Sequence, residues 1–208
     1  MPLFEVAEVS KLAEAAKQEL RKRLRALRSA HPAEALAVRG QAIVARALTL
    51  PQFAAARGVA LFFPLLDRKE VDLRALDAEA RRQGKRVYYP FLEARGKAQV
   101  SGLRLTRSLD DLADRGQRFL EPPSDATEAA RGDVDLLFVP ALGVAPSGHR
   151  LGYGAGFYDS LLPDVCPPAQ AVAVVYDFQL LVEVPILPHD VACDLVLTDA
   201  RSLLVDKP

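Results

Sequence analysis

The feature that most constrains the fold of this chain is a short apolar run followed by a glycine-rich loop and the start of a helix. Residues 136–139 contain no polar side chain, which is typical of a strand buried on both faces of a parallel sheet. Gly152, Gly154 and Gly156 then occupy alternate positions, and a helical pattern begins at Phe157. Such a loop directs backbone N–H groups and a helix N-terminus toward an anion. The stretch therefore predicts an α/β fold with a phosphate-binding loop.

The glycine loop does not match the two commonest phosphate-binding motifs. A Walker A loop requires a lysine after its glycines, and none follows here. A dinucleotide fingerprint requires G-x-G-x-x-G directly after the strand, whereas here the third glycine comes one residue early after a long loop. Asp177, which ends the apolar run at 171–176, keeps a dinucleotide site open as an alternative. A surface loop that needs glycine for positive φ angles is another alternative, but Arg150 beside the glycines favours a phosphate.

Three stretches of the chain resemble one known family. Residues 139–159 read V-P-A-L-G-V-A-P-S-G-H-R-L-G-Y-G-A-G-F-Y-D, which resembles the signature of 5-formyltetrahydrofolate cyclo-ligase, also called 5,10-methenyltetrahydrofolate synthetase. Residues 179–199 and the K-Q-E-L-R sequence at 17–21 are similar to two further patterns of that family. The departures are Ala155, Phe157 and Ser160, which stand where glycine, tyrosine and arginine are common.

The resemblance implies an enzyme that uses ATP and Mg²⁺ to close 5-formyltetrahydrofolate, with or without a polyglutamate tail, into 5,10-methenyltetrahydrofolate. Transfer of a phosphoryl group to the formyl oxygen creates a good leaving group, and such transfer needs positioning more than a protein nucleophile. The sequence shows no Ser-His-Asp or Cys-His constellation, in agreement with that chemistry. The alternatives are a dinucleotide-dependent oxidoreductase, a related-fold sugar-phosphate isomerase or acyl-transferring enzyme, and a non-catalytic folate- or nucleotide-binding relative.

The resemblance also implies which residues form the site. Arg150 and Tyr158 are the implied catalytic residues, and Asp159 and Asp194 are the implied magnesium ligands. The implied ATP-binding residues are Lys17, Arg21, Arg150, Leu151, Gly152, Tyr153, Gly154, Ala155, Gly156, Phe157 and Tyr158. The implied substrate-binding residues are Phe63, Glu70, Tyr153, Gly154, Gly156 and Phe157. Asp67 is an alternative to Glu70, because the spacing between strand and acid is longer here than in some relatives.

Hydrophobic periodicity outlines the rest of the fold. It predicts helices at residues 9–29, 33–48 and 73–83, and strands at 59–63, 86–89, 99–106, 136–139, 171–176 and 194–198. We expect Pro90 to end the second strand, and Ser108 with Asp111 to form a capping box. The expected architecture is a three-layer α/β/α fold with a mostly parallel sheet, preceded by an N-terminal helical arm. The expected division is one domain over 1–208, with the arm at 9–50 and the core at 57–208.

The charge balance limits the partners. The 208 residues contain 27 Lys plus Arg and 27 Asp plus Glu, so the net charge is zero and any anion site is local. This balance disfavours nucleic acid and membrane surfaces as partners and favours a small-molecule substrate. The two cysteines have no metal-like spacing, and the first residues lack a signal-length apolar core. We therefore expect a cytoplasmic protein, and we favour a monomer.

Overall fold

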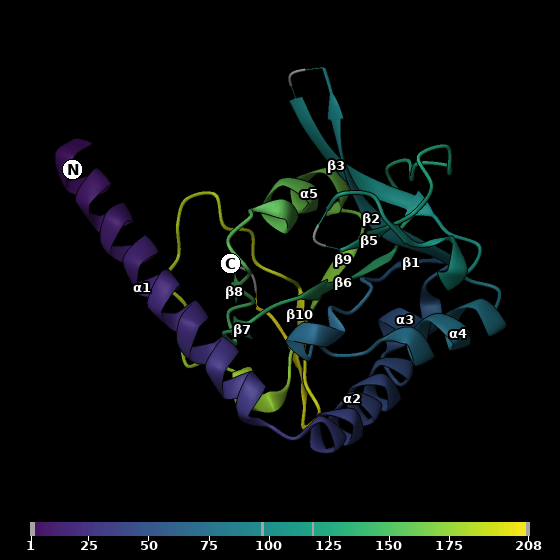
Figure 1. Ribbon diagram of the computed structural model, residues 1–208, viewed down its shortest axis with the longest axis horizontal. Coiled ribbons are helices and arrows are strands. Elements are labelled where there is room, and N and C mark those ends of the chain that lie inside the picture. Colours follow the sequence, from purple (N-terminus) through teal and green to yellow (C-terminus); the bar gives the residue numbers. More distant parts are fainter. Residues whose placement is uncertain (1–2, 97, 118, 207–208) are drawn as a thin grey trace.

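The computed structural model describes residues 3–96, 98–117 and 119–206, and its centre is a seven-stranded sheet (Figure 1). The strand order is β11-β10-β9-β6-β1-β2-β3. The inner strands are parallel to one another, and they are β10 (Leu195–Leu197), β9 (Gln170–Val174), β6 (Leu136–Pro140), β1 (Gly58–Ala60) and β2 (Arg86–Arg95). The antiparallel edges are β3 (Ala98–Leu105) and β11 (Ser202–Leu204).

Helices cover both faces of the sheet, so the predicted three-layer α/β/α fold is confirmed. On one face, α2 (Ala33–Leu48), α3 (Pro51–Ala55) and α4 (Arg74–Arg82) enclose a cluster that includes Leu136 and Phe138 of β6. On the other face, α5 (Phe157–Val165) packs on a cluster that includes Leu137 and Val139 of the same strand. Alternate residues of β6 thus enter opposite cores, which explains why this strand has no polar face.

Helix α1 (Leu3–Ala30) packs beside the sheet rather than on it (Figure 1). Its buried Leu24 belongs to a third cluster, together with Leu142, Leu151 and Val184 from loops that follow the strands. Helix α2, which the sequence analysis grouped with the arm, instead shares the main core through Ile43 and Ala47. Of the predicted arm at 9–50, only α1 therefore stands off the sheet.

The prediction that Pro90 ends the second strand is wrong, because β2 continues to Arg95. The carbonyl of Tyr88 accepts the N–H of Leu61, so Pro90, two residues later, faces the same side of the strand. Strand β1 has already ended at Ala60 on that side. The missing N–H of proline therefore costs no ladder hydrogen bond there.

Several short elements carried no periodic signal and were not predicted. Two-residue strands form the hairpins β4 (Ala113–Asp114) with β5 (Leu120–Glu121) and β7 (Gly143–Val144) with β8 (Arg150–Leu151). The 3₁₀ helices η1 (Leu66–Arg68) and η3 (Asp177–Gln179) were also not predicted, whereas η2 (Leu109–Asp111) is the short helix expected after Ser108. The predicted capping box of Ser108 and Asp111 is confirmed at η2.

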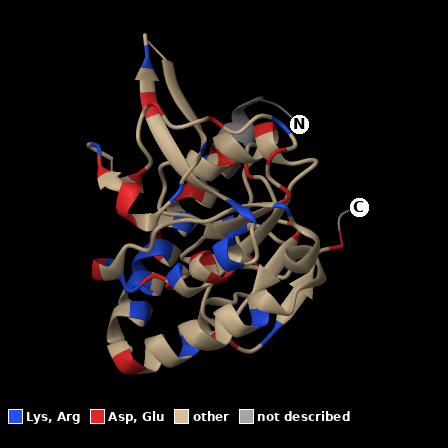
Figure 2. Ribbon diagram, turned by 90° about the vertical axis from the view of Figure 1, so that its right-hand side faces the viewer, with Lys and Arg blue, Asp and Glu red and all other residues tan. Residues whose placement is uncertain are grey.

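Charged residues of both signs alternate over the ribbon, as Figure 2 shows. This distribution agrees with the zero net charge and leaves charge clusters to local sites. Among the described residues, no helix combines the length and the apolarity that a bilayer crossing requires.

The β2–β3 pair has a close contact that predicts the effect of one substitution. A Cβ on Gly102 would lie 2.6 Å from Cε1 of Phe91, whose ring is covered by the Arg104 guanidinium at 3.7 Å from the centroid. Gly102→Ala should therefore lower the free energy of unfolding by about 1–3 kcal/mol, because the Phe91 ring must shift and disturb its contact with Arg104 to accept the methyl group. Urea denaturation measures this loss.

Gly40→Ala is the matched control, because a Cβ there meets nothing within 4 Å and the position is helical. It should raise stability by about 0.5–1 kcal/mol through the better helix propensity of alanine. Equal stability of the two variants would contradict the packing argument.

Candidate active site

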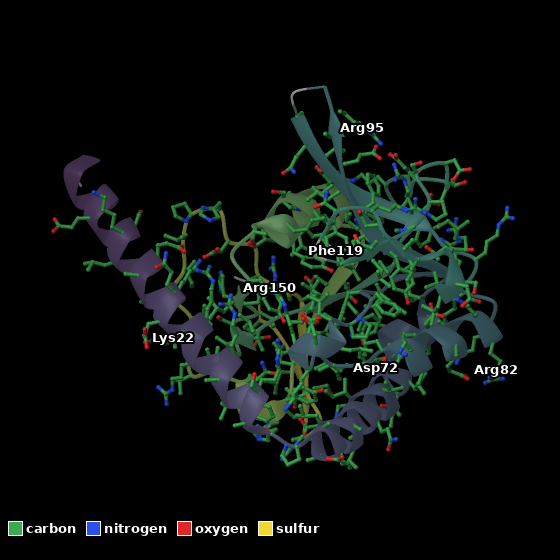
Figure 3. All side chains as sticks on the ribbon, in the orientation of Figure 1. Lys22, Asp72, Arg82, Arg95, Phe119 and Arg150 are labelled. Atoms are coloured by element: carbon green, nitrogen blue, oxygen red, sulfur yellow. The ribbon has the colours of Figure 1, made fainter. Side chains whose placement is uncertain are left out.

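A cavity of about 680 Å³ opens at the carboxyl ends of the parallel strands. Phe62 and Phe63, which follow β1, line it together with Leu92 of β2 and Pro140 at the end of β6. This is the edge at which open parallel sheets bind ligands. Helix α1 forms the opposite wall, and Arg150 lies between that helix and the core (Figure 3).

The glycine loop forms one side of the cavity. Gly154 and Gly156 have φ angles of +98° and +68°, a region that L side chains rarely adopt. Gly156 is the N-cap of α5, and no side chain caps this helix. The loop and the first turn of α5 therefore offer uncapped backbone N–H groups to the cavity, which suits an anion. The predicted residues 150–158 all line the cavity.

One face of α1 contributes charged side chains to the cavity. Glu14, Lys17 and Arg21 are spaced by three and four residues, which places them on the same side of the helix. Lys17 is buried and forms an ion pair with Asp190. Arg21 donates through Nε to the Gly152 carbonyl at 3.1 Å and through a guanidinium nitrogen to Glu14 at 2.8 Å. The helix is thus joined directly to the glycine loop.

Arg150 is buried at the inner end of the loop and is held on two sides. Its guanidinium donates to the Val191 carbonyl at 2.6 Å and to Oδ1 of Asp159 at 2.8 Å. Oδ1 of Asp159 also lies 3.4 Å from the Val191 N–H. This network brings Asp159 next to the segment that contains Asp190.

The predicted pairing of Asp159 with Asp194 at the cavity is corrected by this geometry. Asp194 precedes β10, and its Oδ2 accepts the N–H of Ala171 at 2.7 Å, near the start of β9. This is the amino end of the parallel strands, and Asp194 does not line the cavity. Asp190 lines the cavity instead, beside Asp159. The sequence signal that could have identified it is the His189-Asp190 pair in the C-terminal pattern.

Of the two alternative acids, Glu70 lines the cavity and Asp67 does not. Glu70 is buried, lines the cavity and accepts the Leu65 N–H at 2.8 Å. The Asp67 side chain is 79% exposed and lies outside the cavity lining. Burial raises the pKa of Glu70, and the hydrogen bond from Leu65 opposes this effect.

Two tyrosines of the loop region line the cavity as neutral donors. Burial raises the pKa of both Tyr153 and Tyr158 well above the usual phenol range. Each phenol therefore keeps its proton at neutral pH. Tyr158 can donate a hydrogen bond to a ligand oxygen, but it cannot act as a base there.

Several cavity residues were missed in the sequence. Phe119, in a stretch that had no signal of its own, reaches the cavity and packs edge-on against Phe157 with ring centroids 5.4 Å apart (Figure 3). Gln117 lines the same wall and donates to the Leu92 carbonyl at 3.1 Å. The further missed residues are Glu14, Arg68, Gln99, Ser101, His189 and Asp190.

The described residues contain no group of three or more His, Cys, Asp or Glu side chains that converge as a metal site. Asp159 and Asp190 are therefore a pair of carboxylates at the cavity wall, and Nε2 of His189 lies 3.9 Å from Oδ1 of Asp190. Such a pair fits Mg²⁺, which takes one or two carboxylates and completes its shell with water and substrate phosphates.

Comparison with known proteins identifies one family. The sequence description of the 5-formyltetrahydrofolate cyclo-ligase family matches residues 13–199. A 5-formyltetrahydrofolate cyclo-ligase of Mycolicibacterium smegmatis is 48% identical over 92 residues, which cover 44% of this chain and 47% of that protein. The match therefore spans about half the length of that relative. A mouse protein of the same name is 29% identical over 189 residues, covering 86% and 89% of the two chains.

A solved structure agrees with this family. The solution structure of 5,10-methenyltetrahydrofolate synthetase from Aquifex aeolicus superposes with a TM-score of 0.78 at 27% sequence identity. The superposition covers 92% of this chain and 94% of the Aquifex chain. The likeness therefore extends over most of both chains.

The position of Asp194 predicts a structural role. Asp194→Ala should lower the free energy of unfolding by about 1–3 kcal/mol, because the buried N–H of Ala171 loses its acceptor. Thermal or urea denaturation measures the change. Asp164→Ala, at an exposed position of α5, is the control and should stay within about 0.5 kcal/mol of the parent. A parent-like stability of Asp194→Ala would contradict the structural role.

Proposed function

This chain belongs to the 5-formyltetrahydrofolate cyclo-ligase family, and from that premise we propose that it converts 5-formyltetrahydrofolate and ATP into 5,10-methenyltetrahydrofolate, ADP and phosphate, with Mg²⁺. The observation that carries the proposal is that cations from α1 and β8 line the same cavity as the uncapped glycine loop. These cations are Lys17, Arg21 and Arg150. A cavity of about 680 Å³ falls within the usual range for small-molecule sites.

The triphosphate fits the side of the cavity formed by α1 and the glycine loop. The N–H groups of the loop and of the first turn of α5 suit phosphate oxygens, and the positive φ angles of Gly154 and Gly156 keep side chains out of their path. Arg150 can hold two oxygens at once with its planar guanidinium. Lys17 and Arg21 add point charge from the opposite wall.

Asp159 and Asp190 are the residues that would hold Mg²⁺. Both line the cavity, and the Val191 N–H that contacts Asp159 belongs to the residue after Asp190. Bound Mg²⁺ supplies charge neutralisation of the phosphates during transfer. In this structure each acid is paired with a cation, Asp159 with Arg150 and Asp190 with Lys17. The cavity therefore offers carboxylates for Mg²⁺ and cations for the phosphates of a nucleotide.

The reduced folate fits the other side of the cavity, between aromatic and acidic residues. Phe63, Phe119 and Phe157 provide apolar walls for a flat ring system. Glu70 can accept hydrogen bonds from ring N–H groups of the folate when it is ionised. Tyr158, which keeps its proton, can donate to an oxygen that gains negative charge.

The proposed reaction balances without a covalent enzyme intermediate. The γ-phosphoryl group moves from ATP to the formyl oxygen, and ADP is released. The N10 nitrogen then attacks the formyl carbon and loses its proton, and phosphate leaves with the former formyl oxygen. Catalysis therefore consists of positioning and charge stabilisation, which the residues of the cavity can provide.

The proposal predicts formation of the methenyl product from purified protein. With ATP, Mg²⁺ and 5-formyltetrahydrofolate, the near-ultraviolet absorbance of the methenyl compound should rise, with one ADP released per product. Omission of ATP should abolish the rise, because the formyl oxygen is then a poor leaving group. Binding of ATP and folate without product would identify a non-catalytic relative and would refute the proposed reaction.

The two carboxylates predict a change in magnesium dependence. Asp159→Asn and Asp190→Asn should each raise the Mg²⁺ concentration for half-maximal activity by roughly tenfold or more, because each removes one charged ligand. The measurement is initial rate against Mg²⁺ at fixed ATP. Asp194→Asn is the control and should keep the parent's magnesium dependence. A rise for Asp194→Asn with none for Asp190→Asn would reverse the assignment.

A further inference from the structure

Behind the glycine loop lies a buried arginine that the proposed reaction does not use directly. Arg28 of α1 is 3% exposed and does not line the cavity. Its guanidinium donates to the phenol oxygen of Tyr153 at 2.5 Å. Its Nε is buried and has no hydrogen-bond acceptor among the described atoms. Burial of a charge with incomplete pairing is costly, so a stabilising ion pair does not explain this arginine.

The hydrogen bonds lead from Arg28 to the cavity. The Tyr153 oxygen accepts from Arg28, and its own proton is donated to the carboxylate of Glu70. Glu70 also accepts the Leu65 N–H, and its backbone carbonyl accepts the Tyr176 hydroxyl at 3.3 Å. Glu70 is therefore held by hydrogen bonds from several elements. One of its partners, Tyr153, is itself hydrogen-bonded to a buried cation.

We propose that Arg28 is a positioning residue: through the hydroxyl of Tyr153 it orients the Glu70 carboxyl group toward N–H groups of the reduced folate. This inference rests on the proposed function, since it assigns Glu70 to the folate side of that site. It adds a residue outside the cavity to the machinery for substrate recognition. It also gives Tyr153, a residue of the glycine loop, a second role as the link between Arg28 and Glu70.

The charged surroundings of Glu70 support this role. Burial raises the pKa of Glu70, and the groups that lower it are the Leu65 N–H, Tyr153, Arg28 and Arg68, in that order. Arg68 lies over the Tyr153 ring at 5.2 Å, on the open side of the cavity. The other ionisable groups near Glu70 are Tyr158 and Tyr176, which stay neutral because burial raises the pKa of both phenols. Arg28 is thus the buried cation in this set.

The direction of the effect follows from these charges. Glu70 is ionised above its raised pKa and neutral below it. Loss of Arg28 removes a group that lowers this pKa, so the pKa rises further. A neutral Glu70 cannot accept two folate N–H groups in the same way, because one of its oxygens then carries a proton. Folate binding should therefore weaken at the acidic end of the pH range before ATP binding does.

The test titrates Glu70 directly by NMR of protein labelled with ¹³C at glutamate carboxyl carbons, with Glu70→Gln to assign the signal. Arg28→Met should raise the pKa of Glu70 by about one unit, a tenfold loss of the ionised form at pH values below both pKa values. Tyr153→Phe should shift it in the same direction, because it removes the relaying hydroxyl and keeps the ring. Arg28→Lys should raise the pKa of Glu70 by less than Arg28→Met does, because it keeps a positive charge.

Arg25→Met is the matched control. Arg25 is exposed on the same helix, and its guanidinium lies 5.9 Å from the Tyr153 ring centroid, against 5.8 Å for Arg28, without a hydrogen bond to the phenol. It should leave the Glu70 titration at the parent's value. In steady-state kinetics, Arg28→Met and Tyr153→Phe should raise the KM for folate and shift its acidic limb to higher pH.

Unchanged titration of Glu70 in folded Arg28→Met and Tyr153→Phe would overturn the inference, as would a Glu70 that is neutral at pH 7.5 in the parent. If Arg28→Met does not fold, Arg28→Gln, which removes the charge and keeps a polar side chain, decides the result. A parent protein that makes no methenyl product refutes the proposed function. A parent that makes product while the two variants titrate like it refutes only the role of Arg28.

Discussion

The site depends on the burial of cationic side chains from α1. Lys17 and Arg28 are each 3% exposed although they belong to a helix that packs beside the sheet. A buried charge requires a partner, and these two find theirs on loops far along the chain, at Asp190 and Tyr153. Both contacts depend on the position and rotation of the helix. Its docking therefore fixes one wall of the cavity.

The sheet supplies the opposite wall through its connections. Long loops leave the carboxyl ends of β1 and β6, and the second loop forms the β7–β8 hairpin before it reaches the glycines. Arg150 in β8 is thereby brought back over the sheet edge, where it meets Asp159 of α5. This inserted hairpin also separates the glycines from the strand, which distinguishes the loop from a dinucleotide-binding turn.

Opposite charges are balanced within the cavity rather than across the protein. Arg150 pairs with Asp159, Lys17 with Asp190, and Arg21 with Glu14. Such pairing offsets part of the desolvation cost of placing several ionised groups in a partly enclosed space. It also places cations and carboxylates together, as the transfer of a phosphoryl group from a magnesium nucleotide requires.

The sequence by itself determined the local structure and the chemical type of the site. The all-apolar run of β6, the alternate glycines and the helical repeats predicted the layers of the sheet and the phosphate loop, because these patterns depend on neighbouring residues. The family signature led to Glu70, Lys17 and Arg150. The two-residue strands and the continuation of β2 past Pro90 were not predictable. Both depend on which neighbouring strand is available for hydrogen bonding.

Only the tertiary structure decided which distant residues share the cavity. Asp190 and Asp194 are four residues apart, yet one faces Lys17 and the other supports the start of β9. Phe119 reaches the cavity and Arg28 reaches Tyr153 through the packing of loops and of α1, although the sequence carried no signal that placed either residue there. The physical reason is that periodicity reports which face of an element is buried, whereas contacts between residues such as Lys17 and Asp190 depend on how whole elements dock.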